Sequence, residues 1–500
     1  MNSYSLPRCA PEEVGIHSAD ILKLVRDLEQ SGTEMHSLMI LRHGKVCAEG
    51  WWSPYAQGTV QALQSFTKTV TGTAYGAAEQ LGLLDLNERV LDIFPEYAHL
   101  TRGSYWDELR LYHLMTMSAG MDRMYPVKAE DWQPGFFTIP IANKPGSTMF
   151  YNSSACSLVG SCVRKRSGKS LLEFLREHVF SKIGIDSDRV KWLTHPDGQE
   201  NGSGGIMMTT EDDARLIQLY LQHGMWNGEQ VISRRWADMA VQLQNGHVAR
   251  TGENCALGYG GMMWIRENCF YADGGMGQYG IGFPEKDMVI VITETIASAE
   301  ANEAVTRLAF RFDRCVQEEP LPANDADCAQ LRAYLGALSL PKPACSGLHA
   351  ALPTGKTFVI REGVVPLFAE DFCIFNAAYS EPVRTLRFTQ EGRTFTMEVA
   401  SASGVNTFRT STDGRRWYNH LHSNSLATEL ALSADWVDET TLRMDLRWVE
   451  SCRSRTATFR FLPDGNSIRI TVEQGDVGGF DEGPWNALAT AETVQEGDAV

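Results

Sequence analysis

The chain has no long stretch rich in Lys and Arg, no long apolar segment and no C-x-x-C pair of cysteines. Its formal net charge is −17, from 45 basic and 62 acidic residues. This balance disfavours nucleic acid and anionic membranes as partners, because both are bound by basic patches. No apolar run is long enough to span a bilayer, and the first residues show no charged segment followed by an apolar one. We therefore expect neither a membrane span nor a signal peptide.

The eleven cysteines are scattered, and none belongs to a C-x-x-C pair. This spacing disfavours the common zinc and redox patterns. The odd count fits buried thiols in a reducing compartment better than a disulfide framework. We expect a cytoplasmic protein with no metal and no cofactor. Hydrophobic residues make up 43% of the chain and charged residues 21%, which is the balance of a folded globular protein.

One short motif carries chemical information, the pair Ser65 and Lys68 at the start of an apolar helical run. Residues i and i+3 lie on one helix face, so a short serine and a long lysine can meet without help from distant sequence. The unpaired N–H groups of a first helical turn also favour a developing alkoxide. The motif predicts a nucleophile beside its own base. Alone it is weak, because S-x-x-K occurs by chance and then marks only a helix start with a solvated lysine.

A second candidate is Tyr151, in a loop that begins at Pro145-Gly146 and leads into a helical segment. A phenol and an ammonium group that share one proton can act as general base and general acid. We therefore pair Tyr151 with Lys68. The structural alternative is an ordinary buried tyrosine in a turn.

The segment Phe270 to Gly275 is predicted to be a strand that ends in glycines, which allow a substrate backbone to approach closely. The amides of Gly275 and Ser65 are the predicted oxyanion hole. The stretch Gly275 to Gly280 also matches G-x-G-x-x-G, but that fingerprint requires a following helix, and a strand is expected here. Dinucleotide binding is therefore not predicted. There is no G-x-S-x-G elbow, so an α/β-hydrolase is not supported either.

The first part of the chain has predicted strands at both ends and helices between them. A helix is expected from about Ser18, a hairpin over 37–51 and the Ser65 helix to about Gln80. Four strands are expected over 258–293, followed by a helix over 299–316. This order predicts an α/β (α+β) domain with an antiparallel sheet of sequence-distant strands, flanking helices and a helical subdomain.

The chain changes character after a cluster of prolines that begins at Pro320. Beyond it, short alternating segments and turns such as 463–466 predict an all-β domain, a small barrel or sandwich. The expected organisation is a hydrolase domain over 1–320, a linker with a short helix over 321–344, an all-β domain over 345–490 and a disordered tail over 491–500.

In family order and spacing, these segments resemble the serine β-lactamase/penicillin-binding-protein superfamily. The closest resemblance is to its class C-like branch of esterases, D-aminopeptidases and 6-aminohexanoate-dimer hydrolases. It runs from about Pro11 to Val316, and the all-β domain resembles the barrel-like domains of some members. Besides the motifs above, it rests on Leu83 to Val90, Phe94-Pro-Glu96, His113 to Gly120, Pro145 to Gly160 and Ser203 to Arg215.

The resemblance implies roles for matching residues. Ser65 corresponds to the acylated serine, Lys68 to its partner and Tyr151 to the tyrosine of a Y-x-N motif. The third residue of that motif is here Ser153 rather than Asn. This departure weakens the case for penicillin binding.

The third motif of the family, K-T-G or H-x-G, is replaced by Ala272-Asp273-Gly274. The cation that usually meets a substrate carboxylate is absent, and Asp273 has the opposite charge. Together with Ser153, these three residues are the expected substrate-binding positions.

The sequence therefore favours a serine hydrolase that forms an acyl-enzyme on a small-molecule ester or amide. An acyltransferase, a β-lactamase or DD-peptidase, and a non-catalytic binding homologue are the alternatives. The sequence does not indicate the oligomeric state.

Overall fold

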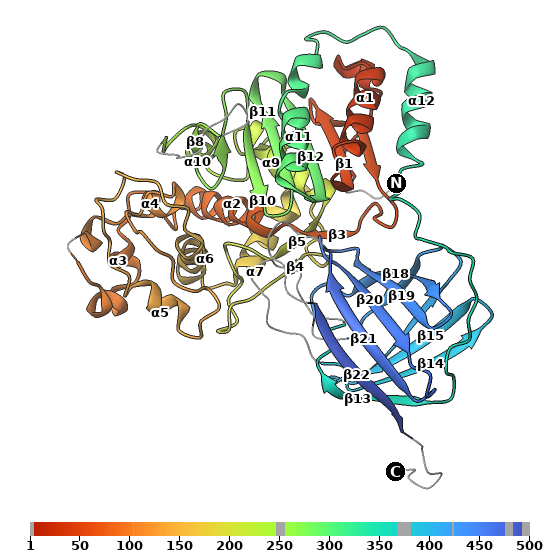
Figure 1. The fold of residues 1–500 in the computed structure, drawn as a ribbon. Helices are drawn as coiled ribbons and strands as arrows, with labels where there is room; N and C mark the ends of the chain where they lie inside the picture. The colour runs from red at the N-terminus through yellow and green to blue at the C-terminus, as the bar shows by residue number, and fades with distance from the viewer. Residues whose placement is uncertain are drawn as a thin grey trace. The chain divides into compact units, whose positions relative to one another are not determined.

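The computed structural model describes residues 5–103, 105–246, 256–367, 382–422, 425–475 and 484–492. The chain divides into two compact units (Figure 1). The first unit consists of Met1–Trp51, Val60–Glu294 and Ala299–Leu338, and the second of Trp52–Thr59, Thr295–Ser298 and Ser339–Val500.

The expected linker over 321–344 contains α12 (Asp325–Leu335), which falls within the first unit. Of the expected tail, residues 491–492 end the last strand, and residues 493–500 lie outside the described part of the chain.

The first unit is built on a seven-stranded sheet in the order β2-β1-β12-β11-β10-β9-β8. The pairs β1–β2, β8–β9, β9–β10, β10–β11 and β11–β12 are antiparallel. The early strand β1 lies beside the late strand β12, so the expected sheet of sequence-distant strands is confirmed. The strands are β1 (Glu34–Arg42), β2 (Lys45–Trp51), β8 (Gly258–Tyr259), β9 (Trp264–Ile265), β10 (Phe270–Gly274), β11 (Gln278–Phe283) and β12 (Met288–Thr295).

Helices cover this sheet because its central strands are apolar on both faces. All of β12 except Thr295 is buried. The helices α1 (Ser18–Glu29) and α11 (Ala299–Phe310) contact each other, and α9 (Thr210–Leu221) packs against β1 and β11.

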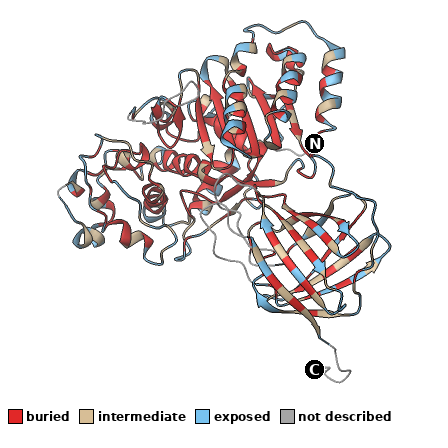
Figure 2. Ribbon diagram, in the orientation of Figure 1, coloured by how far each residue is buried: buried red, intermediate tan, exposed pale blue. Residues whose placement is uncertain are grey.

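The helix α2 (Thr67–Gln80) is buried on all sides from Thr67 to Ala78, as Figure 2 shows in red. A helix buried all round belongs to the core of a domain rather than to its surface. Glycine at position 76 permits a close contact, since a Cβ atom there would lie 2.4 Å from Cδ1 of Trp236. The helix α6 (Ser153–Ser167) packs along α2. This packing fixes the helix that follows Ser65.

The remaining elements of the first unit are short. They are α3 (Val90–Ile93), α4 (Leu111–Met115), α5 (Trp132–Phe136), α7 (Leu171–Leu175), α8 (Ser181–Ile183), α10 (Arg234–Ala240), β3 (Val60–Ala62), β4 (Lys191–Trp192), β5 (Ile206–Thr209), β6 (Met225–Trp226) and β7 (Glu229–Gln230). Among the described residues, no helix combines the length and apolar character needed to cross a membrane.

The second unit is a nearly closed, antiparallel, ten-stranded barrel-like sheet in the order β16-β15-β14-β13-β22-β21-β20-β19-β18-β17. Its two end strands meet through the side chain of Asn419. The Asn419 oxygen accepts from the Arg409 N–H at 2.7 Å, and its Nδ2 donates to the Arg409 carbonyl at 2.9 Å. The strands are β13 (Thr357–Gly363), β14 (Thr385–Glu391), β15 (Thr394–Ala400), β16 (Val405–Ser411), β17 (Trp417–His420), β18 (Glu429–Asp438), β19 (Thr441–Trp448), β20 (Ser454–Phe461), β21 (Ser467–Gln474) and β22 (Trp485–Glu492).

The barrel unit also holds the early segment Trp52–Thr59. The Leu340 N–H donates to the Ser53 carbonyl at 2.9 Å, and the Tyr418 hydroxyl donates to the Pro54 carbonyl at 2.8 Å. The chain thus enters the second unit and returns to the first at Val60, five residues before Ser65.

Candidate active site

Ser65 lies in a 3-10 turn, Gln64–Phe66, that runs directly into α2. The sequence predicted a helix beginning at Ser65, and the regular α-helix begins two residues later. Gln64 has a φ of 49°, a left-handed conformation that is uncommon for a residue other than glycine. Such strain is typical of functional sites when the surrounding structure enforces it.

The turn is fixed by hydrogen bonds on both sides of Ser65. The Leu63 N–H donates to the Ile206 carbonyl at 2.9 Å. The Thr67 hydroxyl donates to the Gln64 carbonyl at 2.5 Å and accepts from the Ile206 N–H at 3.2 Å. Strand β5 therefore holds the turn before and after the serine.

Lys68 is buried with 1% of its surface exposed, and its Nζ atom points at the serine. Its Nζ lies 3.0 Å from Ser65 Oγ and donates to the Ser203 carbonyl at 2.7 Å. A neutral amine retains two hydrogens, so one can remain on the Ser203 carbonyl while the lone pair faces Ser65. The geometry therefore suits proton transfer from serine to lysine.

Tyr151 is joined to Lys68 by its ring. The Nζ atom of Lys68 lies 4.8 Å from the ring centroid. The same ring stacks on Trp264 with centroids 5.7 Å apart and an angle of 11°, and meets Tyr259 edge-on at 6.2 Å. These aromatic neighbours orient Tyr151 toward the lysine. The sharing of a proton through the phenol oxygen stays a prediction.

Tyr259, behind Tyr151, is fully buried. Burial raises the pKa of Tyr259 well above its usual value, and the nearby acidic groups Tyr151 and Asp273 add to the effect. We therefore treat Tyr259 as a neutral phenol that packs Tyr151 and transfers no proton.

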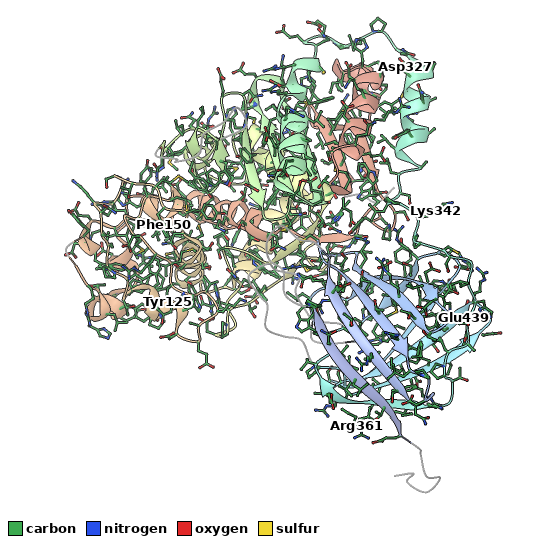
Figure 3. All side chains as sticks on the ribbon, in the orientation of Figure 1. Tyr125, Phe150, Asp327, Lys342, Arg361 and Glu439 are labelled. Atoms are coloured by element: carbon green, nitrogen blue, oxygen red, sulfur yellow. The ribbon has the colours of Figure 1, made fainter. Side chains whose placement is uncertain are left out.

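Asn152 and Ser153 begin α6, and sulfur atoms accept their N–H groups. Met117 Sδ accepts from Asn152 N and Met124 Sδ from Ser153 N, both at 3.2 Å. Asn152 is a helix cap, since its Oδ1 accepts from Ala155 N at 3.1 Å. Ser153 is half-buried beside it. Figure 3 labels Tyr125, which follows Met124, and Phe150, which lies two residues before Asn152.

Strand β10 lies directly against the Ser65 turn. A Cβ atom on Gly274 would come within 2.2 Å of the Leu63 carbonyl oxygen, so only glycine permits this approach. Ala272 is buried with 1% exposed, whereas Asp273 and Gly275 are half-buried. The structure thus brings Gly274 against Leu63, two residues before Ser65, and it buries the methyl group of Ala272. The oxyanion hole formed by the Gly275 and Ser65 amides stays a prediction.

The expected strand after Gly275 is present as β11, and so the glycine fingerprint is not followed by a helix. Sequence reasoning missed the Ser203 carbonyl and the aromatic support from Trp264. Backbone carbonyls leave no residue-type signal, although the glycines at 202, 204 and 205 marked a segment suited to close approach.

Comparisons with known proteins define the family of this chain. The β-lactamase family profile matches residues 23–310, more than half of the chain. The chain therefore belongs to the β-lactamase family, and its relatives include hydrolases of that fold. The superfamily resemblance found in the sequence is confirmed.

Two curated relatives show how low the sequence identity to this chain is. A β-lactamase of Yersinia enterocolitica is 28% identical over 159 residues, 30% of this chain and 37% of its own length. The 6-aminohexanoate-dimer hydrolase of Paenarthrobacter ureafaciens is 24% identical over 239 residues, 44% of this chain and 59% of its own. The chain thus spans less than two thirds of either relative.

A provisionally assigned β-lactamase from Bacteroides dorei shares the fold. It superposes with a TM-score of 0.50 at 13% identity, over 59% of this chain and 98% of that structure.

Proposed function

We propose that the protein is a serine hydrolase that cleaves a small-molecule ester or amide through an acyl-enzyme on Ser65. The observation that carries the proposal is the position of Lys68 Nζ, 3.0 Å from Ser65 Oγ and anchored on the Ser203 carbonyl. A buried lysine held in this way is placed to act as a base.

In the proposed first half-reaction, Lys68 takes the hydroxyl proton as Ser65 Oγ attacks the substrate carbonyl carbon. The resulting oxyanion accepts hydrogen bonds from the amides of Ser65 and Gly275. When the tetrahedral intermediate collapses, the bond to the leaving group breaks and Tyr151 supplies the leaving group with a proton. The proton that Lys68 took from Ser65 then replaces the one that Tyr151 gave away. In the second half-reaction the Lys68–Tyr151 pair takes a proton from water as the water oxygen attacks the acyl carbon. The bond between the acyl carbon and Ser65 Oγ then breaks, and the pair returns that proton to Oγ, so that the acid is released and the free enzyme is restored.

The substrate in this proposal lacks a carboxylate at the third-motif position. Ala272 offers no cation there, and Asp273 is a half-buried acid on the same strand. The site therefore fits neutral or amine-bearing esters and amides better than anionic β-lactams.

Ser65→Ala tests the proposal. We expect loss of labelling by a fluorophosphonate and a fall in kcat of about 10⁴-fold or more on p-nitrophenyl esters, with unchanged thermal unfolding. Ser403→Ala, which changes an exposed serine of the second unit, should behave as wild type. Labelling or turnover retained in purified Ser65→Ala would refute the proposal.

A further inference from the structure

The turn that carries the Gly275 amide is strained and needs support. It joins β10 to β11, and its residues Met276 and Gly277 have φ values of 70° and 94°. The left-handed conformation is costly for Met276, whereas glycine adopts it freely at position 277. The Gly277 N–H closes the turn on the Gly274 carbonyl at 3.2 Å. Something outside the turn must help to hold this backbone.

Glu294, near the end of β12, packs directly against the turn. A Cβ atom on Gly277 would lie 2.3 Å from both Cγ and Oε1 of Glu294. The main chain of Glu294 is also tied to the turn, because Gln278 Nε2 donates to its carbonyl at 2.7 Å. Both the side chain and the backbone of one residue therefore meet the segment that follows Gly275.

The Glu294 carboxyl group is in an unusual environment. It is fully buried, and its polar neighbour among the described residues, the Thr33 side chain, leaves both oxygens without a well-formed hydrogen bond. Burial raises its pKa well above the usual value, although the neighbouring Thr33 hydroxyl lowers it somewhat. A charge there would be expensive, so the group is an uncharged acid.

We propose that Glu294 is a positioning residue whose carboxyl group holds the Gly275–Gly277 turn so that the Gly275 amide points at the oxyanion. This inference rests on the proposed function, since it assigns the support of that oxyanion hole. Glu294 touches the turn and no reacting atom, and its effect on the reaction passes through Gly275.

The test compares Glu294→Ala with Glu294→Gln, which keeps the shape of the neutral acid. We expect Glu294→Ala to lower kcat by about 10- to 100-fold with KM changed less than about threefold, because a displaced oxyanion donor affects the transition state. Glu294→Gln should restore kcat to within about threefold of wild type. The rate of fluorophosphonate labelling should follow kcat.

The control is Val291→Ala, which makes a cavity on the same strand opposite Gly280. It should lower the unfolding temperature without the loss of kcat. Equal loss of kcat in Val291→Ala and Glu294→Ala would overturn the inference, as would a Glu294→Gln variant as poor as Glu294→Ala.

A second variant keeps the inference testable if Glu294→Ala folds poorly. Gly277→Ala pushes a methyl group into the same space and should lower kcat in the same way. Because the two residues share one contact, Gly277→Ala/Glu294→Gln should lose about as much as Gly277→Ala alone. A loss of kcat in Gly277→Ala smaller than about threefold would overturn the inference. If a fluorophosphonate does not label the wild-type protein at Ser65, the proposed function itself is refuted.

Discussion

At the residue scale, Lys68 and Tyr151 share one task in the proposed mechanism. Tyr151→Phe removes only the hydroxyl and keeps the ring against Lys68 and Trp264. We expect Lys68→Ala and Tyr151→Phe each to lower kcat by at least about 100-fold, and the double variant to lose little more than the worse single one. Steady-state kinetics of the four proteins on one ester provide the measurement. Strictly additive losses would show that Tyr151 only packs.

Asp273 gives a prediction about substrate charge. A carboxylate within about 5 Å of a substrate carboxylate repels it by about 1 to 3 kcal/mol in a partly desolvated cleft. Asp273→Thr should therefore raise kcat/KM for an anionic ester, relative to its neutral analogue, by about fivefold or more. Glu439→Gln, an exposed charge removal in the second unit, is the control (Figure 3). If the ratio does not move, Asp273 does not sense the substrate.

The site was predictable where its chemistry is local. Ser65 and Lys68 are three residues apart, and their meeting follows from helix geometry alone. The Ser203 carbonyl comes from a loop 135 residues from Lys68. No side chain in either segment predicts that this carbonyl accepts a hydrogen bond from Lys68. The role of Glu294 depends on the path of the Gly277 backbone, which only the folded sheet defines.

At the scale of the element, α9 shows how one acidic cluster divides into different roles. The run Glu211-Asp212-Asp213 follows threonines at the start of the helix, which is a typical capping pattern. Asp212 does belong to the cap, since its N–H donates to Thr209 Oγ1 at 3.2 Å. Asp213 turns inward instead, fully buried and with neither oxygen hydrogen-bonded among the described residues. A sequence pattern cannot say which of three adjacent acids faces the core.

The buried Asp213 should make stability fall with rising pH. Burial, with the neighbouring charge of Asp212, raises the pKa of Asp213 well above its usual value. The folded state then keeps a proton that the unfolded state loses, so stability decreases from the ordinary aspartate range up to the folded pKa. Asp213→Asn should remove the contribution of Asp213 to this decline and be more stable at neutral pH, by about 1.4 kcal/mol for each unit by which the pKa is raised.

The measurement is the free energy of urea unfolding of the full-length protein, followed at the transition of its first unit, between about pH 5 and pH 9. Asp188→Asn is the control, because the side chain of Asp188 is 85% exposed. Parallel pH dependence of Asp213→Asn and wild type would contradict the assignment.

The strands of the barrel differ in how well their sequence predicts them. Strands β15 and β20 alternate buried residues with more exposed ones. They belong to the short alternating segments from which the sequence predicted an all-β domain. In β18, five consecutive residues from Leu430 to Ala434 are buried. Alternation is absent there, and so the same rule did not find this strand.

At the scale of the whole molecule, the second unit is not simply a C-terminal addition. It includes Trp52–Thr59, in which Trp52 and Tyr55 are only 2% and 4% exposed. A chain ending at Leu338 loses Leu340 and Tyr418, which bond to this segment. We expect that truncated chain to aggregate and to unfold at lower temperature, because each newly exposed aromatic side chain forfeits about 1.5 to 3 kcal/mol of burial.

Light scattering and thermal unfolding of the truncated chain provide the check. Replacing both Trp52 and Tyr55 by serine in that chain should reduce its aggregation. A truncated chain as soluble and stable as the full protein would show that the segment does not need the second unit.

The early position of Trp52–Thr59 also has a consequence for synthesis. This segment leaves the ribosome nearly three hundred residues ahead of Ser339, where the main part of its unit begins. At about 5 to 20 residues per second, it waits on the order of 15 to 60 s for its partners. During that time its aromatic side chains lack their final neighbours, while the strand that leads to Ser65 has already emerged. A nascent chain stalled in this interval is thus a natural substrate for chaperones, and release from them depends on the last third of the protein.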